Sequence, residues 1–447
     1  MDRATALTEA FLNTLSPADA DLANLRQAVE EVARDVITVE KNDPDWAAAR
    51  VLRRIVEPDR VISFGVTWTD DAGDVQVNRG WRVQASNAIG PYKGGLRFHP
   101  AVTLDDLRFL AFEQCFKNAL TGLPLGGAKG GSDFDPSGRS DAEIMRFCQA
   151  FMRQLAPHIG PDKDVPAGDI NVGAREIGYL FGAWRQMSGI YAGALTGKAP
   201  AYGGSEIRTE ATGYGLIYFV QAMLARTGAA ITGHRVAISG KGNVATHAAR
   251  KAIDEGATVI TLSDTSGTLY APDGFDHAAI DWVVQRKAQG ADLSDPPRHI
   301  AAQFCEGAQP WAQDADIALP CATQNEIDEK AAQALVDNGV QLLAEGANMP
   351  TTRDGLRVLR KARVTYAPGK AANAGGVAVS GLEMSQMSHR RFMSADEVDQ
   401  ALRTLMSDIH DRVATEGKGD GGIDYARGAN LAGYRRLAQA ITAQGVI

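Results

Sequence analysis

The spacing of hydrophobic residues changes from helical to alternating near residue 60. Up to about Val56 the pattern predicts helices, with breaks near Ser16 and Asp43, each of which precedes a proline. From Val61 the spacing becomes two residues, over VISFGVTWT and VQVNRGWRVQAS, and the polar turn DDAGD separates these segments. The pattern therefore predicts N-terminal helices followed by a β-hairpin.

Helical spacing returns between two glycine-rich segments, PYKGGLR and LGGAKGG. A helix is predicted from Thr103 to Leu120, because Thr103 and Asp106 form a capping-box pattern and Gly122 is a typical stop. The two glycine-rich segments are expected to be loops, in which glycine permits positive φ and the close approach of a ligand.

Three lysines in this stretch are candidates for binding an anion: Lys93, Lys117 and Lys129. Gln114 and Lys117 lie three residues apart, so they share a face of the predicted helix. A lone helical lysine is usually a solvated surface residue, but solvation does not explain the glycines on both sides of Lys129. We expect these segments to direct three cations at one anionic ligand.

The segment DKDVPAGDINVG contains another candidate, Asp169. Val165 precedes a proline and is predicted to be extended, and Asn171 is expected to cap a helix that begins near Gly173. Asp169 then lies in the loop before this helix, where the sequence leaves a turn or capping role and a chemical role equally open.

A strand, a turn, a helix and a second strand are predicted in RVAIS, GKGNVA, THAARKAIDEG and ATVITLSD. Gly240, Gly242 and Ala245 form G-x-G-x-x-A in the turn, and Asp264 closes the second strand 24 residues after Gly240. In this context the motif predicts a dinucleotide-binding βαβ unit. Three further strand patterns, ADIALP, VQLLAEGA and RVTYAPG, alternate with helical segments, which indicates a doubly wound parallel sheet.

Polar residues follow these last three strands, at Thr323, Asn348 and Asn373. Because ligands bind at the carboxyl ends of parallel strands, these residues are candidates for the rim of a cofactor site. Beyond them, helices are predicted after Gly376, from a cap at Ser394 and over 427–443.

Composition is that of a soluble globular protein and argues against some functions. Of 447 residues, 45% are hydrophobic and 22% are charged, which suits two or three ordinary domains. The formal net charge of −8 argues against nonspecific nucleic-acid binding. Four widely spaced cysteines are expected to be reduced thiols. Neither a signal peptide nor an apolar stretch of about 18 residues is apparent, so a cytoplasmic location without a membrane span is expected.

Eight motifs are distributed along the chain between residues 91 and 434: PYKGGLRFHP, FEQCFKNALTGLPLGGAKGG, PAGDINVG, RTEATGYG, SGKGNVA, EGAN, AANAGGVAVSGLEMSQ and YARGANLAGY. The chain thereby resembles hexameric glutamate dehydrogenases of the Glu/Leu/Phe/Val dehydrogenase family. The resemblance implies an α/β fold with two domains. Residues 1–204, joined by a C-terminal helix at 427–447, would bind substrate and oligomerise, and residues 205–426 would form a Rossmann-like dinucleotide-binding domain with connecting helices. It also implies a homohexamer in which a cleft between the domains closes.

The resemblance also implies a role for each candidate residue. Lys129 is expected to be the catalytic lysine, and Asp169 the proton-transferring carboxylate. The expected substrate-binding residues are Lys117 and Gln114 for the α-carboxylate, Lys93 and Ser380 for the distal carboxylate, and Ala167. The expected cofactor-binding residues are Arg208, Thr212, Gly240, Gly242, Asn243, Val244, Ser263, Asp264, Thr323, Asn348 and Asn373. No metal is expected.

General chemistry supports the two catalytic roles independently. Burial and neighbouring cations such as Lys117 disfavour a charged lysine, so the pKa of Lys129 is expected to be lowered. A neutral amine can activate the water needed for imine chemistry, and Asp169 can exchange protons with the substrate nitrogen.

The expected coenzyme is NADP. An acid at the position of Asp264 usually favours a free ribose 2′-hydroxyl, and hence NAD. The segment Ser263 to Thr265, however, is similar to the Ser-Asp-Ser of NADP-dependent members of the family. Lys241, where relatives often carry serine, can supply positive charge together with Arg286 and Lys287.

Other functions stay open on the sequence alone. An NAD-dependent glutamate dehydrogenase, or a leucine, phenylalanine or valine dehydrogenase, would have a similar core, but apolar pockets have no need of Lys93 and Ser380. A pyridoxal-phosphate enzyme with a Schiff base at Lys129 would leave G-x-G-x-x-A unexplained. A catalytically silent nucleotide sensor would need neither Lys129 nor Asp169.

Overall fold

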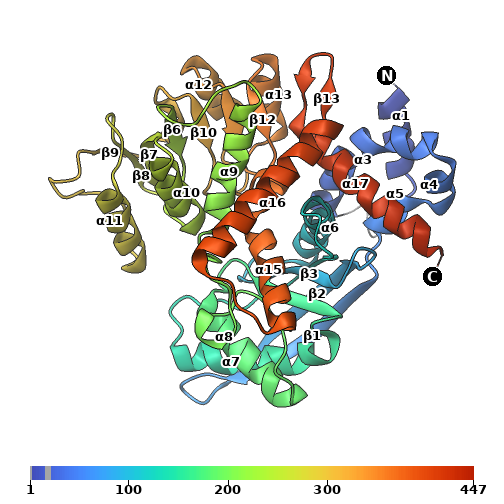
Figure 1. Ribbon diagram of the computed structural model, residues 1–447. Helices are drawn as coiled ribbons and strands as arrows, with labels where there is room; N and C mark the ends of the chain where they lie inside the picture. Colours follow the sequence, from blue (N-terminus) through green and yellow to red (C-terminus); the bar gives the residue numbers. More distant parts are fainter. Residues whose placement is uncertain (1–2, 16–21, 447) are drawn as a thin grey trace. The chain divides into compact units, whose positions relative to one another are not determined.

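The computed structural model describes residues 3–15 and 22–446 (Figure 1), so the predicted break near Ser16 lies outside the described residues. The chain forms two compact units. The first comprises Met1–Glu206, Val379–Val398 and Asn430–Ile447, and the second comprises Ile207–Ala378 and Asp399–Ala429. Residues 379–398 thus belong to the first unit, whereas the sequence analysis assigns them to the second domain. Their long-range polar contacts explain this, because Glu383 pairs with Lys198.

A five-stranded mixed sheet organises the first unit, in the order β1-β2-β4-β3-β5. Its strands are β1 (Arg60–Thr69), β2 (Val75–Ser86), β3 (Tyr92–Phe98), β4 (Gly127–Ser132) and β5 (Asp164–Gly168). β1, β2 and β4 pair antiparallel, and β3 lies parallel to both β4 and β5. The predicted hairpin is therefore confirmed as β1 and β2.

The glycine-rich segments around Lys93 and Lys129 are strands β3 and β4, so their prediction as loops is wrong. None of their glycines has positive φ. Glycine is needed there because neighbouring atoms leave no room for a side chain. A Cβ on Gly94 would lie 1.6 Å from the carbonyl oxygen of Ala128, and one on Gly131 would lie 2.3 Å from that of Arg97. The glycines thus serve close packing within the sheet.

Helices surround this sheet. They are α1 (Arg3–Leu12), α3 (Ala23–Asn42), α4 (Pro44–Ala49), α5 (Val51–Val56), α6 (Leu104–Leu120), α7 (Asp141–Leu155) and α8 (Ala174–Ser188), with 3₁₀ turns η1 (Ala156–His158) and η2 (Pro200–Tyr202). α6 begins with the predicted capping box. The predicted Asn171 cap of α8 is wrong: Gly173 occupies the cap position and donates its N–H to Glu176 (2.8 Å). The Asn171 amide instead donates to the carbonyl of Phe98 (3.0 Å).

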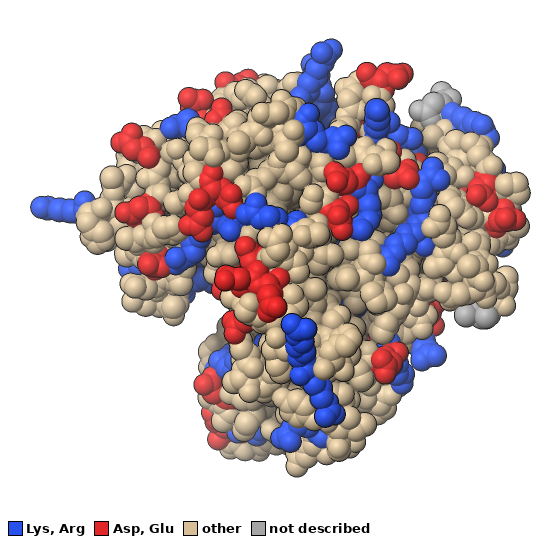
Figure 2. All heavy atoms as spheres, in the orientation of Figure 1, with Lys and Arg blue, Asp and Glu red and all other residues tan. Residues whose placement is uncertain are grey.

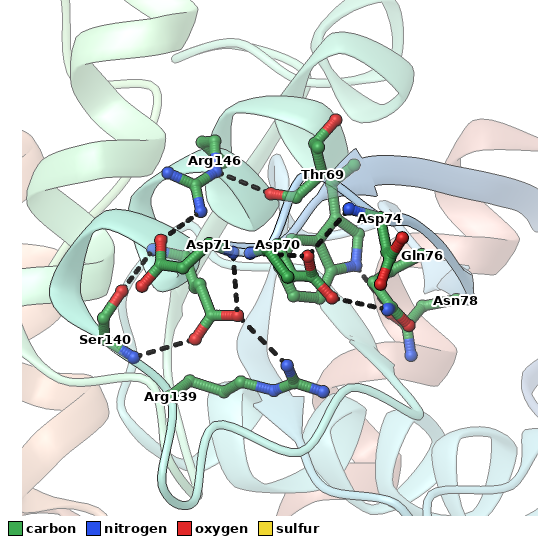
Figure 3. A network of polar contacts seen from close by, with 12 residues as sticks. Thr69, Asp70, Asp71, Asp74, Gln76, Asn78, Arg139, Ser140 and Arg146 are labelled. Carbon is green, nitrogen blue, oxygen red and sulfur yellow. Dashed lines mark hydrogen bonds and ion pairs between the residues drawn. The ribbon is translucent and has the colours of Figure 1, made fainter.

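An aromatic core packs α7 against the sheet. Phe134 stacks on Phe147 with ring centroids 3.7 Å apart, and Phe98 meets Phe147 edge-on at 5.1 Å. At the rim of this core, the β1–β2 turn is tied to α7 (Figure 3). Arg146 donates to the carbonyl of Thr69 and to Asp71, both at 2.6 Å. These contacts hold the β1–β2 turn against α7.

A seven-stranded sheet organises the second unit, in the order β12-β11-β10-β6-β7-β8-β9. Its strands are β6 (Arg235–Ile238), β7 (Thr258–Asp264), β8 (Gly267–Tyr270), β9 (Gln303–Glu306), β10 (Ile317–Leu319), β11 (Leu342–Ala344) and β12 (Thr365–Ala367). The strands from β12 to β7 run parallel, as predicted, and β8 and β9 add an antiparallel edge. The helices between them are α9 (Ala211–Ala225), α10 (Asn243–Asp254), α11 (His277–Ala288), α12 (Glu329–Asp337), α13 (Arg353–Lys361) and α14 (Gly369–Ala372), with the 3₁₀ turn η3 (Pro310–Ala312).

Three long helices close the chain: α15 (Gly375–His389), α16 (Ala395–Glu416) and α17 (Tyr425–Gln444), with the short pair β13 (Lys418–Gly419) and β14 (Gly422–Ile423) between the last two. Each of these helices contains residues of both units. The predicted cap at Ser394 is confirmed, because its hydroxyl oxygen accepts the N–H of Glu397 at 3.3 Å and its own N–H donates to the Glu397 carboxylate at 2.7 Å. Among the described residues, no helix is long and apolar enough to cross a membrane. Figure 2 shows basic and acidic side chains interspersed on one face of the molecule.

Candidate active site

Lys129 and Asp169 meet within the first unit. Lys129, on β4, is buried, and its Nζ lies 3.2 Å from Oδ2 of Asp169, which follows β5. The same oxygen accepts a hydrogen bond from Nε of Arg97, on β3, at 2.7 Å. Three strands thus bring an amine, a carboxylate and a guanidinium together at one oxygen. Arg97 is not among the residues expected from the sequence, although it is part of the motif PYKGGLRFHP.

The charges in this cluster shift both ionisable groups. Burial lowers the pKa of Lys129; the charge of Asp169 opposes that shift, while Arg97 and Arg82 reinforce it. The predicted lowering is therefore supported, with Arg97 and Arg82 as the cations where the sequence analysis named Lys117. Burial alone would raise the pKa of Asp169, but Lys129 and Arg97 more than offset it, so this pKa lies below its usual range. Asp169 is consequently ionised at neutral pH.

Gly95 makes room for this cluster. A Cβ at Gly95 would lie 2.8 Å from Cβ of Asp169 and 3.4 Å from Nζ of Lys129. Gly95 pairs with Ala167 in the β3–β5 register, which places the candidate Ala167 beside the same cluster. The close approach of β3 and β5 therefore depends on the absence of a side chain at Gly95.

Polar contacts connect the α6 candidates to Lys93. The amide of Gln114 donates to Oδ1 of Asn118 (2.7 Å), and the amide of Asn118 donates to the carbonyl of Lys93 (3.0 Å). Lys93 is buried, and its Nζ donates to Oγ1 of Thr196 at 2.8 Å. Lys117 follows Gln114 on the same helix.

The segment 195–198 links Lys93 to α15, which carries the buried Ser380. Next to Thr196, Gly197 donates its N–H to Glu383 (2.9 Å), and Lys198 forms a fully buried ion pair with Glu383 at 2.6 Å. Ser380 and Glu383 are three residues apart on α15 and share a face. This chain of contacts supports the predicted convergence of Lys93 and Ser380. Thr196 was missed because nothing in its local sequence marks it.

The βαβ unit has the features that a dinucleotide requires. Gly240 has φ of 89°, a conformation that other residues rarely adopt, and Gly242 is the N-terminal cap of α10. No atom lies within 4 Å of a Cβ placed on Gly242, so the space beside it is open to a ligand. Backbone N–H groups at this helix start suit a pyrophosphate. Asn243 opens the helix, and Val244 lies beside Gly346 after β11.

A second cluster of cofactor candidates surrounds Asn373. Its amide nitrogen donates to the carbonyls of Gly346 and Ala347 and to Oδ1 of Asn348, at 3.0–3.2 Å. Its buried Oδ1 has no hydrogen-bond partner, which fits a donor supplied by a ligand. Arg208 and Thr212 both lie beside Gly376, at the start of α15.

The remaining cofactor candidates lie at the ends of other parallel strands. Thr323 is exposed after β10 and donates its N–H to Glu326. Ser263, near the end of β7, accepts a hydrogen bond from the N–H of Gly240 at 2.9 Å. Its neighbour Asp264 pairs with Lys241 at 2.6 Å. The predicted cofactor residues thus all occur in the second unit: Arg208 and Thr212 precede its first strand, Ser263 and Asp264 end β7, and the others lie on loops or helices that follow its parallel strands.

Comparison with known proteins assigns the family. Residues 203–445 match the description "Glutamate/Leucine/Phenylalanine/Valine dehydrogenase", and residues 58–186 match "Glu/Leu/Phe/Val dehydrogenase, dimerisation domain". The chain is 51% identical to an NADP-specific glutamate dehydrogenase of Escherichia coli, with 100% of both chains covered. It is 49% identical to an NAD-specific glutamate dehydrogenase of Bacteroides fragilis, over 98% of this chain and 99% of the relative.

A solved structure supports the same assignment. The glutamate dehydrogenase of Plasmodium falciparum is 41% identical and superposes with a TM-score of 0.96, covering 99% of this chain and 95% of that one. The two-domain α/β fold is therefore shared along with the sequence motifs. The chain belongs to the Glu/Leu/Phe/Val dehydrogenase family.

Proposed function

We propose that the protein is a glutamate dehydrogenase. It converts 2-oxoglutarate, ammonium, NADPH and a proton to L-glutamate, NADP⁺ and water, reversibly. The observation that carries the proposal is a pair of buried lysines, Lys93 and Lys129, on the adjacent strands β3 and β4. A buried lysine is stabilised by a neighbouring anion or is retained for a role in catalysis. A substrate with two carboxylates supplies such anions.

Lys129 and Asp169 carry the proton transfers. With its lowered pKa, Lys129 is available as a neutral amine that takes a proton from water. The protonated amine then stabilises negative charge on the substrate oxygen. Asp169, held ionised by Arg97, accepts a proton from the substrate nitrogen in one direction and returns it in the other. NADPH, when bound, supplies the hydride that the substrate Cα receives.

The substrate is oriented by two groups of residues. Lys117 and Gln114, on α6, hold the α-carboxylate next to the reacting carbon. Lys93 and Ser380 hold the distal carboxylate, and Thr196 positions the Lys93 ammonium. This arrangement favours a dicarboxylic oxo-acid, because an apolar substrate side chain would offer no carboxylate to the Lys93 ammonium.

We also propose that the coenzyme is NADP, that the enzyme is a homohexamer and that it works in the cytoplasm. Lys241 and Lys287 support NADP, because Lys241 pairs with Asp264 at the end of β7 and Lys287 adds positive charge beside this pair. The long edge strand β1 and the exposed Val75 and Val77 support assembly. The four cysteines are free, which suits a reducing compartment.

A spectrophotometric assay tests the proposed function. The purified chain is mixed with 2-oxoglutarate, ammonium and either NADPH or NADH, and coenzyme oxidation is followed. We expect rapid oxidation of NADPH, slower oxidation of NADH, and no turnover of either by a Lys129→Ala variant that still binds coenzyme. Absence of turnover with both coenzymes, or equal activity with 2-oxohexanoate, would count against a glutamate dehydrogenase.

A further inference from the structure

The carboxylate of Asp264 is fully occupied by the protein. Its Oδ2 contacts Nζ of Lys241 at 2.6 Å and accepts the N–H of Leu293 at 3.0 Å. Its Oδ1 accepts the N–H and the hydroxyl of Ser266, at 2.9 and 2.5 Å. Two donors thus saturate each oxygen, and only 5% of the side chain is exposed.

This environment removes the usual effect of an acid at the end of the second strand. In dinucleotide-binding folds such an acid accepts a hydrogen bond from the ribose 2′-hydroxyl, and its charge repels a 2′-phosphate. Here a ribose hydroxyl would have to displace an existing donor from Asp264. The ammonium of Lys241 also balances the negative charge that would repel a phosphate.

We propose that Lys241 determines coenzyme choice indirectly, by occupying and neutralising Asp264 so that the end of β7 accepts a ribose 2′-phosphate. This inference rests on the proposed function and deepens it. Lys241 is a positioning residue in this role, because its Nζ is directed to Asp264 and to the carbonyl of Ala291 (2.7 Å).

The groups around the ion pair leave positive charge for the phosphate. Lys287, on α11, donates to Oδ1 of Asn243 at 3.0 Å. Burial, and then the charge of Lys241, lower the pKa of Lys287, so the two cations lie close enough to repel each other. A phosphate dianion would relieve that repulsion. The nearby Arg286 is paired with Asp292 at 3.3 Å, which makes Lys287 the first candidate for direct contact.

The test compares ligands that differ only at the 2′ position, on the full chain. Binding of 2′,5′-ADP and of 5′-AMP is measured by calorimetry, and binding of NADPH and NADH by fluorescence, for the unmodified protein, Lys241→Met, Asp264→Asn and the double variant. Methionine is unbranched and only one atom shorter than lysine but carries no charge, and asparagine keeps the shape of aspartate. The net charge of residues 241 and 264 is therefore zero in the unmodified protein and in the double variant. It is negative in Lys241→Met and positive in Asp264→Asn.

The affinity for the 2′-phosphate is expected to rise as the net charge of the pair becomes more positive. Lys241→Met should weaken 2′,5′-ADP and NADPH about tenfold or more while 5′-AMP and NADH bind at least as tightly as before. The double variant should recover to within about threefold of the unmodified protein, and Asp264→Asn alone should bind 2′,5′-ADP more tightly. A double variant as weak as Lys241→Met would overturn the inference, because it would show Lys241 contacting the phosphate itself.

The controls separate this inference from the proposed function. Unchanged 5′-AMP binding demonstrates that the βαβ unit of a variant is folded. If Lys241→Met does not fold, the Asp264→Asn variant still tests the inference. Unchanged or weaker binding of 2′,5′-ADP by Asp264→Asn would contradict it. An unmodified protein that binds NADPH but does not aminate 2-oxoglutarate would defeat the proposed function alone. If the unmodified enzyme is active and Lys241→Met keeps the same coenzyme preference, only the inference is defeated.

Discussion

At the scale of residues, one carboxylate oxygen joins the three charged groups of the candidate site. Oδ2 of Asp169 is shared by Nε of Arg97 and Nζ of Lys129, at 2.7 and 3.2 Å. A guanidinium does not lose its proton in proteins, so Arg97 is a permanent cation in the cluster. Its positive charge lowers the pKa of both Asp169 and Lys129. Asp169 can therefore stay ionised while Lys129 stays neutral. Arg97 therefore separates the protonation states that the proposed mechanism requires of Asp169 and Lys129.

Removing the charge of Arg97 is expected to move the pH dependence of catalysis upward. Arg97 lowers the pKa of both Lys129 and Asp169, so Arg97→Met should raise both values. Because the proposed mechanism needs neutral Lys129, the acidic limb of the kcat/KM profile for 2-oxoglutarate should shift to higher pH. Arg97→Lys, which keeps a cation, should shift it less. Superimposable profiles for the three proteins would show that Arg97 does not set these pKa values.

The same residues show what the sequence could predict. The helix α6, its cap and the β1–β2 hairpin follow from local patterns, and the structure confirms them. Arg97 and Asp169 lie 72 residues apart in the chain, and Lys93 and Thr196 lie 103 apart. Contacts at such separations leave no local signal. A family resemblance identifies motifs, but it does not show which neighbour orients which group.

At the scale of elements, the glycine-rich strands hold the candidate site together. The sequence suggested loops because glycine is common in turns, but the glycines of β3 and β4 are there for close packing. β3 lies between β4 and β5, so it is crowded from both sides. The strand that carries Lys93 and Arg97 therefore has little freedom to move. Rigid strands position functional side chains more precisely than loops do.

Two adjacent glycines of β3 should respond differently to the same substitution. A Cβ at Gly94 would meet a backbone carbonyl at 1.6 Å, so Gly94→Ala should force strands apart and cost at least about 2–3 kcal/mol of stability. A Cβ at Gly95 would lie 2.8 Å from Cβ of Asp169, 3.0 Å from the carbonyl oxygen of Gly168 and 3.4 Å from Nζ of Lys129. Gly95→Ala should therefore cost less stability than Gly94→Ala and should mainly lower kcat. Denaturant unfolding and steady-state kinetics measure the two effects. Equal losses of stability with equal losses of kcat would contradict this division.

Substrate choice should depend on the contacts between β3, the 195–198 segment and α15. Lys93→Leu should raise the KM for 2-oxoglutarate by orders of magnitude, because the distal carboxylate loses its ammonium. Combined with Ser380→Val, it should allow 2-oxohexanoate to react. Thr196→Val is the matched control, since it removes only the hydroxyl that accepts from Lys93 and should have a smaller effect on KM. Unchanged 2-oxoglutarate kinetics in Lys93→Leu would refute the placement of the distal carboxylate.

At the scale of the whole molecule, the two binding tasks are assigned to separate units. The candidate substrate residues all belong to the first unit, and the candidate coenzyme residues all belong to the second. Substitutions in one set should therefore leave ligand binding by the other set measurable.

The first unit has a further feature that a monomer does not explain. Its sheet ends in β1, an edge strand of 10 residues, and long exposed edges promote pairing with another chain.

The hairpin at this edge is expected to be part of the subunit interface. Val75 and Val77 are 68% and 71% exposed, and they share a face with Val61, as the β1–β2 register shows. Burial of this face against a second copy would remove apolar surface from water. Val75→Lys with Val77→Lys should therefore reduce the mass of the assembly measured by light scattering, because association would then bury two charges. Val284→Lys, on α11 of the second unit, replaces another exposed valine and should leave the mass unchanged. A doubly substituted protein with the mass of the unmodified assembly would place the interface elsewhere.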